Sequence, residues 1–355
     1  MHVVILGAAK HPLRQPFAGG LESLTWALVR GLRARGIEVT LFAGAGSDPA
    51  LDAREITVDP LVLSEDARGD VSMPPETWLA EHHAYLQVML ELQRRGDVDV
   101  IHNNSLHYLP VALAQSCPAP MLTTLHTPPT PWLEPAIALM DQSRSRFVAV
   151  SEHTARQWGH VTRAAVVHNG VDTARWTPGP GGEELVWMGR VVPEKAPHEA
   201  VRIAAASGRR IRLAGPVGDV AYFRDRLEPL LGDHAQYVGH LEVAALRDLV
   251  GRSAALVVTP DWDEPYGLVA AESMACGTPV VGYRRGGLPE FVPADCGTLV
   301  EPGDVAAAAA AVDEVCAMDR ARARAHAVAH CSLDAMVDAY VAAYGDLLLA
   351  PEVAA

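Results

Sequence analysis

The sequence predicts an α/β protein made of two domains, each built around a parallel β-sheet. Short apolar runs alternate with segments of helical periodicity along both halves of the 355-residue chain. This alternation favours parallel strands joined by right-handed helical crossovers. Residues 177–182, Thr-Pro-Gly-Pro-Gly-Gly, interrupt the alternation and are typical of a linker. We therefore expect a first domain at residues 1–180 and a second domain at residues 181–331.

Apolar runs in the first half predict the strands of the first sheet. These runs lie at residues 3–6, 39–42, 98–102, 121–126, 147–151 and 165–167. Leu24, Leu28 and Leu32 recur at helical spacing and predict a helix at residues 21–35. A second helix is expected at residues 75–95, because proline is tolerated in a first helical turn.

The second half repeats the pattern. Its strands are expected near residues 185–188, 211–214, 235–238, 255–258 and 280–283. An Ala-rich stretch at residues 305–312 predicts a helix. The last helical stretch begins after Ser332 and places Met336, Tyr340 and Tyr344 on one face.

Composition excludes several classes of function. Apolar residues make up 49% of the chain, which supports a full core. The 29 basic and 43 acidic residues give a net charge of −14, which argues against a nucleic-acid partner. We expect no stable membrane insertion, because the apolar stretches are too short to span a bilayer. The chain starts directly as a strand, without the features of a signal peptide, and its cysteines are scattered, so we expect a cytoplasmic protein.

A pair of glutamates eight residues apart is the most informative motif. Glu264 follows the predicted strand at residues 255–258, and Glu272 falls inside the next predicted helix. Gly267, Leu268 and Val269 lie between them and would supply the first helical N–H groups, which suit a phosphate. Carboxylates accept hydrogen bonds from sugar and ribose hydroxyls. Phosphate with hydroxyl-bearing groups on either side describes a nucleotide sugar.

Two basic residues upstream complete the motif. Arg190 follows the predicted strand at residues 185–188, and Lys195 comes one short loop later. The planar guanidinium of Arg190 and the point charge of Lys195 both suit a diphosphate. The alternative interpretation is a surface ion pair with Glu194, which would contribute little to stability.

Taken together, these motifs resemble the GT-B glycosyltransferases of family 4, which retain the anomeric configuration of the sugar. The resemblance covers nearly the whole chain. It includes the motifs at residues 19–20, 35–42, 125–128, 168–172, 190–195, 213–216, 264–272 and 286–290. It implies two Rossmann-like domains whose parallel sheets face each other across a crevice. The first domain would bind the acceptor, and the second domain would bind the nucleotide-sugar donor. It also implies that residues 332–355 form a helical segment that packs back on the first domain.

The resemblance also assigns roles within the site. It implies that Glu272 binds the ribose hydroxyls and that Glu264 binds the donor sugar. Arg190 and Lys195 would hold the diphosphate, and His126 would lie near the reacting carbon. Gly19 and Gly20 would let the backbone approach the donor closely.

The chain departs from the family pattern at two positions. Ala18 stands where the family commonly has an aromatic residue, and Ala196 stands where glycine usually follows the lysine. These departures concern the loop beside Gly19 and the backbone beside the diphosphate.

We expect neither a metal nor another cofactor, because Arg190, Lys195 and the helix N-terminus already offset the diphosphate charge. Two Asp-x-Asp triplets, Asp97 with Asp99 and Asp261 with Asp263, are the alternative metal ligands. The histidine pairs His82/His83 and His326/His330 are interpreted as surface or packing residues.

The predicted function is a retaining glycosyltransferase that moves a sugar from a UDP or GDP sugar to a hydroxyl of a small molecule or glycan. An NAD-dependent oxidoreductase is disfavoured, because no Gly-x-Gly-x-x-Gly motif follows the first predicted strand. The remaining alternatives are a GT-B sugar-nucleotide epimerase, which needs no acceptor, and a non-catalytic GT-B partner subunit.

Overall fold

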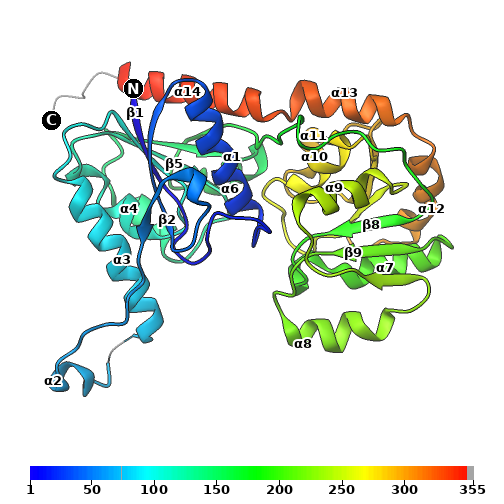
Figure 1. The fold of residues 1–355 in the computed structure, drawn as a ribbon, viewed down its shortest axis with the longest axis horizontal. Helices are drawn as coiled ribbons and strands as arrows, with labels where there is room; N and C mark the ends of the chain where they lie inside the picture. Colours follow the sequence, from blue (N-terminus) through cyan, green and yellow to red (C-terminus); the bar gives the residue numbers. More distant parts are fainter. Residues whose placement is uncertain (73, 350–355) are drawn as a thin grey trace.

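The computed structural model describes residues 1–72 and 74–349, and these residues form two α/β domains (Figure 1). The prediction of two domains with parallel sheets is confirmed. Each described sheet pairs its strands in parallel only, with strand order β3-β2-β1-β4-β5-β6-β7 in the first sheet and β10-β9-β8-β11-β12-β13 in the second. The described residues contain no helix that combines the length and the apolarity needed to cross a membrane.

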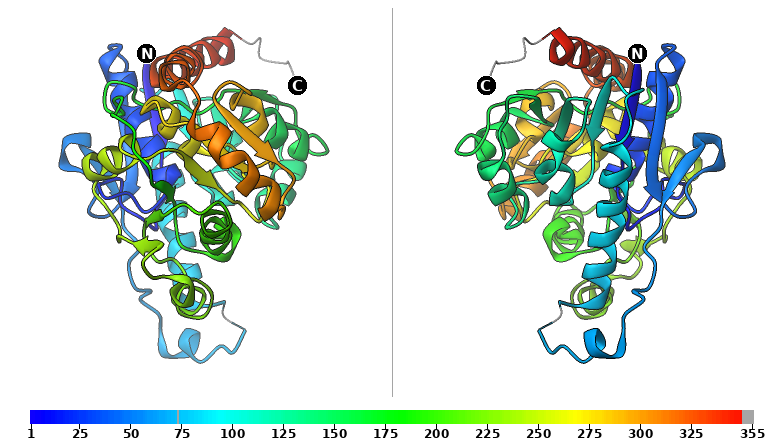
Figure 2. Two further views of the ribbon diagram at one scale, coloured as in Figure 1. Left: turned by 90° about the vertical axis from the view of Figure 1, so that its right-hand side faces the viewer. Right: turned by 90° about the vertical axis from the view of Figure 1, so that its left-hand side faces the viewer.

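The first domain alternates its strands with helices. Its strands are β1 (His2–Leu6), β2 (Glu38–Gly44), β3 (Ala53–Ile56), β4 (Val100–Asn103), β5 (Met121–Leu125), β6 (Ser145–Ala149) and β7 (Ala164–Val166). Its helices are α1 (Gly20–Ala34), α2 (Glu65–Arg68), α3 (Glu76–Leu92), α4 (Tyr108–Ala112), α5 (Leu133–Leu139) and α6 (Glu152–Trp158). Figure 2 shows α2 and the start of α3 projecting from the body of the molecule on the same side as α8.

The second domain repeats the alternation. Its strands are β8 (Leu185–Met188), β9 (Ile211–Ala214), β10 (Ala235–Tyr237), β11 (Leu256–Val258), β12 (Val280–Tyr283) and β13 (Gly297–Val300). Its helices are α7 (Pro197–Ala206), α8 (Val220–Tyr222), α9 (Val243–Gly251), α10 (Leu268–Ala275), α11 (Leu288–Phe291), α12 (Val305–Cys316) and α13 (Arg320–His330). The sequence pattern did not predict β3 or β13. Each of these strands lies at one of the two edges of its sheet.

The chain returns to the first domain at its end. Helix α14 (Leu333–Leu349) lies against α1, and Figure 1 shows it crossing above the first domain. The hydroxyl of Tyr344 lies 2.6 Å from Nδ1 of His102 on β4. The hydroxyl of Tyr340 lies 3.2 Å from Oγ1 of Thr124 on β5. The last part of the segment predicted at residues 332–355, residues 350–355, lies outside the described residues.

A carboxylate from the second domain caps a helix of the first domain. Glu290 on α11 accepts hydrogen bonds from the backbone N–H of Glu152, at 2.8 Å, and from that of His153, at 2.7 Å. These are the first two residues of α6, whose early N–H groups have no partner within the helix. The Nε2 atom of His168 lies 3.2 Å from the same carboxylate. Glu290 therefore ties the domains together directly.

Replacing Glu290 by glutamine should destabilise the junction of the domains. A glutamine offers one accepting oxygen where Glu290 offers two, so one N–H of α6 would lose its partner. Losing a hydrogen bond of this kind, between a backbone N–H and a charged group, costs about 1–3 kcal/mol, and partial exposure to water places the cost near the lower end. We expect a lower urea midpoint for Glu290→Gln. The matched control is Glu301→Gln, since Glu301 is exposed in a loop of the same domain. Equal midpoints for the two variants would contradict this role.

Candidate active site

A cleft of about 630 Å³ lies between the two domains. Its lining comes largely from the segments that follow strands β1, β4, β5, β8, β9 and β11, at their carboxyl ends. Ligands of open α/β sheets bind at that edge. The sequence-predicted site residues that line the cleft are Gly19, Gly20, His126, Arg190, Lys195, Glu264, Gly267, Leu268, Val269 and Glu272. The structure therefore brings the whole predicted set together.

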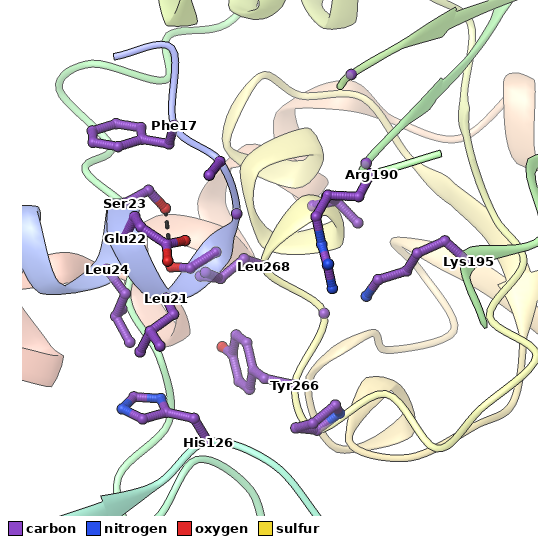
Figure 3. A pocket seen from close by; sticks show the side chains of 18 of the residues that line it. Phe17, Leu21, Glu22, Ser23, Leu24, His126, Arg190, Lys195, Tyr266 and Leu268 are labelled. Carbon is purple, nitrogen blue, oxygen red and sulfur yellow. Dashed lines mark hydrogen bonds between the residues drawn. The ribbon is translucent and has the colours of Figure 1, made fainter. Parts of the chain in front are cut away.

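The segment of the first domain between Phe17 and Leu21, which contains Gly19 and Gly20, faces Arg190 and Leu268 of the second domain (Figure 3). A Cβ atom on Gly20 would lie 3.1 Å from Cδ1 of Leu268, and one on Gly19 would lie 4.0 Å from Nε of Arg190. Side chains at these two positions would therefore narrow the space between the loop and the residues predicted to bind the donor.

Helix α10 starts in the cleft because of Gly267. This residue has a φ of +99°, in the left-handed region that favours glycine, and it forms the N-cap of the helix. A Cβ at Gly267 would lie 2.6 Å from Cδ2 of Leu288, so the packing also requires glycine. The N–H groups of Leu268 and Val269 belong to the first turn, where helices leave backbone donors without an intrahelical partner.

The two basic residues point into the same part of the cleft (Figure 3). Lys195 Nζ forms an ion pair with Glu264, whose Oε2 atom also lies 3.2 Å from Nε1 of Trp262. Arg190 makes a longer contact with Glu194, with 3.8 Å between Nη2 and Oε1. The alternative surface pair with Glu194 thus involves Arg190, whereas Lys195 pairs with Glu264.

Ala196, where the family usually has glycine, adopts a conformation that favours glycine. Its φ of +41° and ψ of 51° lie in the left-handed region, at the N-cap of α7. An L-residue held there carries roughly 1–2 kcal/mol of strain. The alanine methyl group is buried. The carbonyl oxygen of Ala196 accepts a hydrogen bond from Oγ1 of Thr259 at 3.0 Å. Ala196 therefore adopts the backbone conformation that a glycine would favour, and the neighbouring Lys195 still lines the cleft.

The carboxyl group of Glu272 is only partly exposed within the cleft. Burial raises its pKa to about 8, and the positive charge of Arg175 opposes this rise in part. No described residue donates a hydrogen bond to the Glu272 carboxylate. A carboxyl group in this situation is largely protonated at neutral pH. Its ionised form becomes favourable when hydroxyl donors reach it.

His126 is a neutral imidazole. Burial lowers its pKa to about 3, and its Nε2 atom lies 2.8 Å from Oδ1 of Asn104. Because an amide oxygen only accepts hydrogen bonds, Nε2 carries the proton and Nδ1 is free to accept one. His126 can therefore accept a hydrogen bond from a hydroxyl group but does not act as a cation.

The structure adds residues to the cleft that sequence reasoning missed. Glu22 is buried in the first turn of α1, and Trp262 and Tyr266 flank Glu264. Trp262 and Tyr266 each lie two residues from Glu264 in the sequence, and this proximity to a predicted site residue could have indicated that they line the cleft. For Glu22 the signal was its position two residues after Gly20.

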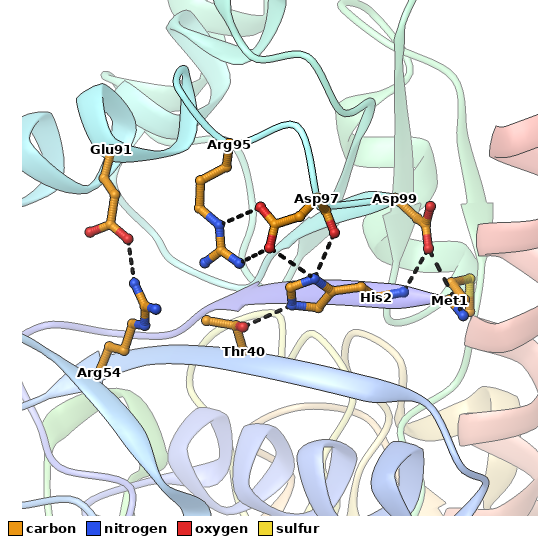
Figure 4. A network of polar contacts seen from close by, with 8 residues as sticks. All are labelled: Met1, His2, Thr40, Arg54, Glu91, Arg95, Asp97 and Asp99. Atoms are coloured by element: carbon orange, nitrogen blue, oxygen red, sulfur yellow. Dashed lines mark hydrogen bonds and ion pairs between the residues drawn. The ribbon is translucent and has the colours of Figure 1, made fainter.

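The first Asp-x-Asp triplet belongs to a structural network at the start of β4 (Figure 4). Asp97 accepts a hydrogen bond from Nε of Arg95 at 2.9 Å, and this partner lowers the pKa of Asp97 to about 2. Asp99 accepts a hydrogen bond from the backbone N–H of His2 at 2.7 Å. Neither aspartate is among the described lining residues of the cleft.

The second triplet lies beside Arg285 and His153. Nη1 of Arg285 lies 3.1 Å from Asp261, and Nε of Arg285 lies 3.8 Å from Asp263. His153 Nε2 lies 3.5 Å from Asp263. Among residues 1–72 and 74–349, no three His, Cys, Asp or Glu side chains are grouped as metal ligands would be.

The histidine pairs take part in packing. His82 stacks on Trp78, with ring centroids 5.2 Å apart, and lies beside His83. His326 contacts His330 and places Nε2 2.9 Å from the carbonyl oxygen of Phe291.

The architecture of two parallel-sheet domains around a cleft is the GT-B fold. Solved structures with the same architecture include a sucrose-phosphate synthase from Thermosynechococcus elongatus, with a TM-score of 0.75, 19% identity and coverage of 98% of this chain and 99% of that chain. Another is Anabaena HepE in complex with UDP-glucose, with a TM-score of 0.74, 18% identity and coverage of 98% and 100%.

The sequence comparisons then give the family. Residues 18–175 match Glycosyltransferase Family 4, and residues 174–329 match Glycosyl transferases group 1. A glycogen synthase of Mycobacterium tuberculosis is 30% identical over 86% of this chain and 85% of that protein. A D-inositol 3-phosphate glycosyltransferase of Mycolicibacterium smegmatis is 31% identical over 88% and 83%. The chain belongs to the family 4 glycosyltransferases.

The raised pKa of Glu272 predicts how nucleotide affinity depends on pH. If ribose hydroxyls donate to Glu272, UDP binds the ionised form better and its binding lowers the pKa. Affinity should then rise roughly tenfold between pH 7 and pH 9, because the group in the free protein titrates near pH 8. The terminal phosphate of UDP, with a pKa near 6, is mostly ionised across this range. Isothermal titration calorimetry measures both affinity and proton release.

The control for this experiment is Glu272→Gln, which cannot ionise. This variant should bind UDP more weakly, and its affinity should stay flat from pH 7 to pH 9. A wild-type affinity that is equally flat would contradict a role of Glu272 in binding the nucleotide.

Proposed function

We propose that this protein transfers a sugar from a UDP or GDP sugar to an acceptor hydroxyl and retains the anomeric configuration. The observation that carries the proposal is the convergence of Arg190, Lys195 and the start of α10 with Glu264 and Glu272 in one cleft. The similarity to a fold that has been solved with UDP-glucose supports it.

In this proposal the diphosphate lies between the two basic residues and the N-terminus of α10. Arg190 and Lys195 supply charge-assisted hydrogen bonds, and the N–H groups of Leu268 and Val269 supply neutral donors. Binding requires Lys195 to exchange its ion pair with Glu264 for a phosphate oxygen. The same exchange frees the Glu264 carboxylate to accept hydrogen bonds from the hydroxyls of the donor sugar.

Glu272 would then bind the ribose. It lies on the same helix as Leu268 and Val269, four residues after the first of them, just over one helical turn. A diphosphate at the helix start therefore leaves its nucleoside end within reach of Glu272. Its sugar end points toward Glu264 and the first domain.

Retention would follow from attack on the same face as the departing phosphate. The acceptor hydroxyl passes its proton to the leaving phosphate oxygen as the new glycosidic bond forms and the bond to phosphate breaks. Arg190, Lys195 and the start of α10 stabilise the charge on that phosphate. Neutral His126 accepts a hydrogen bond from a sugar hydroxyl at Nδ1 without adding charge near the reacting carbon. Closure of the domains would exclude water.

Proton NMR of slow donor hydrolysis tests the proposal without knowledge of the acceptor. Water takes the place of the acceptor, so UDP-α-glucose or GDP-α-mannose should release the α-anomer of the free sugar first, before mutarotation. Arg190→Ala and Lys195→Ala should each slow this release about tenfold to a hundredfold, because each removes a charge-assisted contact of about 1.5–3 kcal/mol. The release should continue in EDTA.

The other results of this experiment have defined meanings. Initial release of the β-anomer would contradict retention. A donor whose sugar changes configuration without cleavage would favour the epimerase. An intact donor, together with no binding of UDP or GDP, would favour a non-catalytic subunit. Activity that is lost in EDTA and restored by Mn²⁺ would assign Asp261 and Asp263 a role in metal binding.

A further inference from the structure

The first-domain side of the cleft carries an aromatic surface that the proposed donor site does not use. We call this surface the aromatic wall and define it by the residues Trp78, Tyr85, His107, Tyr108 and Trp132, all of which line the cleft. Trp78 is 41% exposed and Trp132 is 53% exposed. Exposure of two large aromatic side chains inside a binding cleft indicates a ligand with an apolar face.

The centre of the aromatic wall is a fixed stack of rings. The ring centroids of Tyr85 and His107 lie 4.6 Å apart, and those of His107 and Tyr108 lie 5.1 Å apart. The Tyr85 hydroxyl donates to the carbonyl oxygen of Gly7 at 3.0 Å and accepts from the N–H of Ala9 at 3.0 Å. The stack is thus anchored to the segment after β1, so it needs little ordering when a ligand binds.

The aromatic wall carries no charge at neutral pH. His107 Nδ1 accepts a hydrogen bond from the N–H of Leu109 at 3.1 Å, and burial lowers the pKa of His107 to about 4. On the first-domain side of the described lining, Lys10 is the one lysine or arginine, and it is exposed.

Two carboxylates border this half of the cleft. Glu22 is buried at the start of α1, and Glu81 lies on α3, one helical turn after Trp78. Carboxylates accept hydrogen bonds from hydroxyl groups and repel phosphates. The first-domain half therefore favours a neutral ligand that combines an apolar ring face with hydroxyl groups, which describes a sugar ring.

The family resemblance places the acceptor on the first domain. We infer further that the aromatic wall selects this acceptor, and that it takes the terminal sugar of a neutral glycan or glycoside. The sugar stacks on Trp78 or Trp132, and its hydroxyls donate to Glu22 or Glu81. This inference rests on the proposed function, because it assumes that the second-domain half of the cleft holds the donor. It distinguishes this chain from its relatives named for D-inositol 3-phosphate, an anionic acceptor.

Indole resonances offer a direct test. The chain has 7 tryptophans, so protein labelled with ¹⁵N-tryptophan gives few signals, and Trp78→Phe and Trp132→Phe assign the two that matter. The UDP-saturated protein is titrated with maltose, cellobiose, trehalose and mannobiose, and separately with D-inositol 3-phosphate and with a neutral phenol. At least one disaccharide should shift the Trp78 or Trp132 signal, and the phosphorylated polyol should shift neither.

Kinetics with the disaccharide that binds gives a second test. Trp78→Ala combined with Trp132→Ala should raise the acceptor KM roughly tenfold or more, as the loss of an aromatic anchor does, while the affinity for UDP stays near that of the wild type. The matched control is Leu139→Ala, because Leu139 is an apolar side chain that is 87% exposed and lies outside the cleft.

The outcomes separate this inference from the proposed function. A wild-type protein that binds neither UDP nor GDP contradicts the proposed function. Three results would contradict the acceptor inference alone in a protein that binds UDP. The indole signals of Trp78 and Trp132 could shift with D-inositol 3-phosphate, they could shift with the phenol, or no disaccharide could shift them. An unchanged acceptor KM in the double variant contradicts it as well.

Discussion

The contact of Glu290 with the first turn of α6 joins the two halves of the site directly. Around this contact, the N–H of Gly287 donates to the carbonyl oxygen of Glu264 at 2.8 Å, and Thr154 Oγ1 donates to the carbonyl oxygen of Pro265 at 3.4 Å. The loop that carries Glu264 is therefore held from both domains. Because α10 continues directly from this loop, the position of its N-terminus depends on the same junction.

The two halves of the cleft differ in their electrostatics. The second-domain half concentrates Arg190 and Lys195 in a chain whose net charge is −14, so these cations form a local exception to an acidic surface. The first-domain half carries the aromatic wall, which is uncharged, and it is bordered by the carboxylates of Glu22 and Glu81. Such a division suits a reaction between an anionic donor and an uncharged acceptor, since each substrate is disfavoured in the half meant for the other. The ion pair of Lys195 with Glu264 leaves both charges partnered in the absence of a ligand, and in the proposed function a diphosphate would replace Glu264 as the partner of Lys195.

Much of the fold and of the candidate site was predictable from sequence, because the informative signals are local. Apolar runs of buried parallel strands and the spacing from Glu264 to Glu272 can be read within short windows. Strands β3 and β13 escaped because their sequences, Ala-Arg-Glu-Ile and Gly-Thr-Leu-Val, contain no continuous apolar run. The contact of Glu290 with α6 and the aromatic wall join residues far apart in sequence, which no local pattern encodes. The raised pKa of Glu272 depends on three-dimensional burial for the same reason.

The central claim is that the second-domain half of the cleft binds a nucleoside diphosphate through the start of α10. A crystal structure of the protein with bound UDP tests it most directly. Our account predicts phosphate oxygens within hydrogen-bond distance of Arg190, Lys195 and the N–H of Leu268 or Val269, with both ribose hydroxyls on Glu272. UDP bound with its ribose away from Glu272, or bound outside this cleft, would contradict the account.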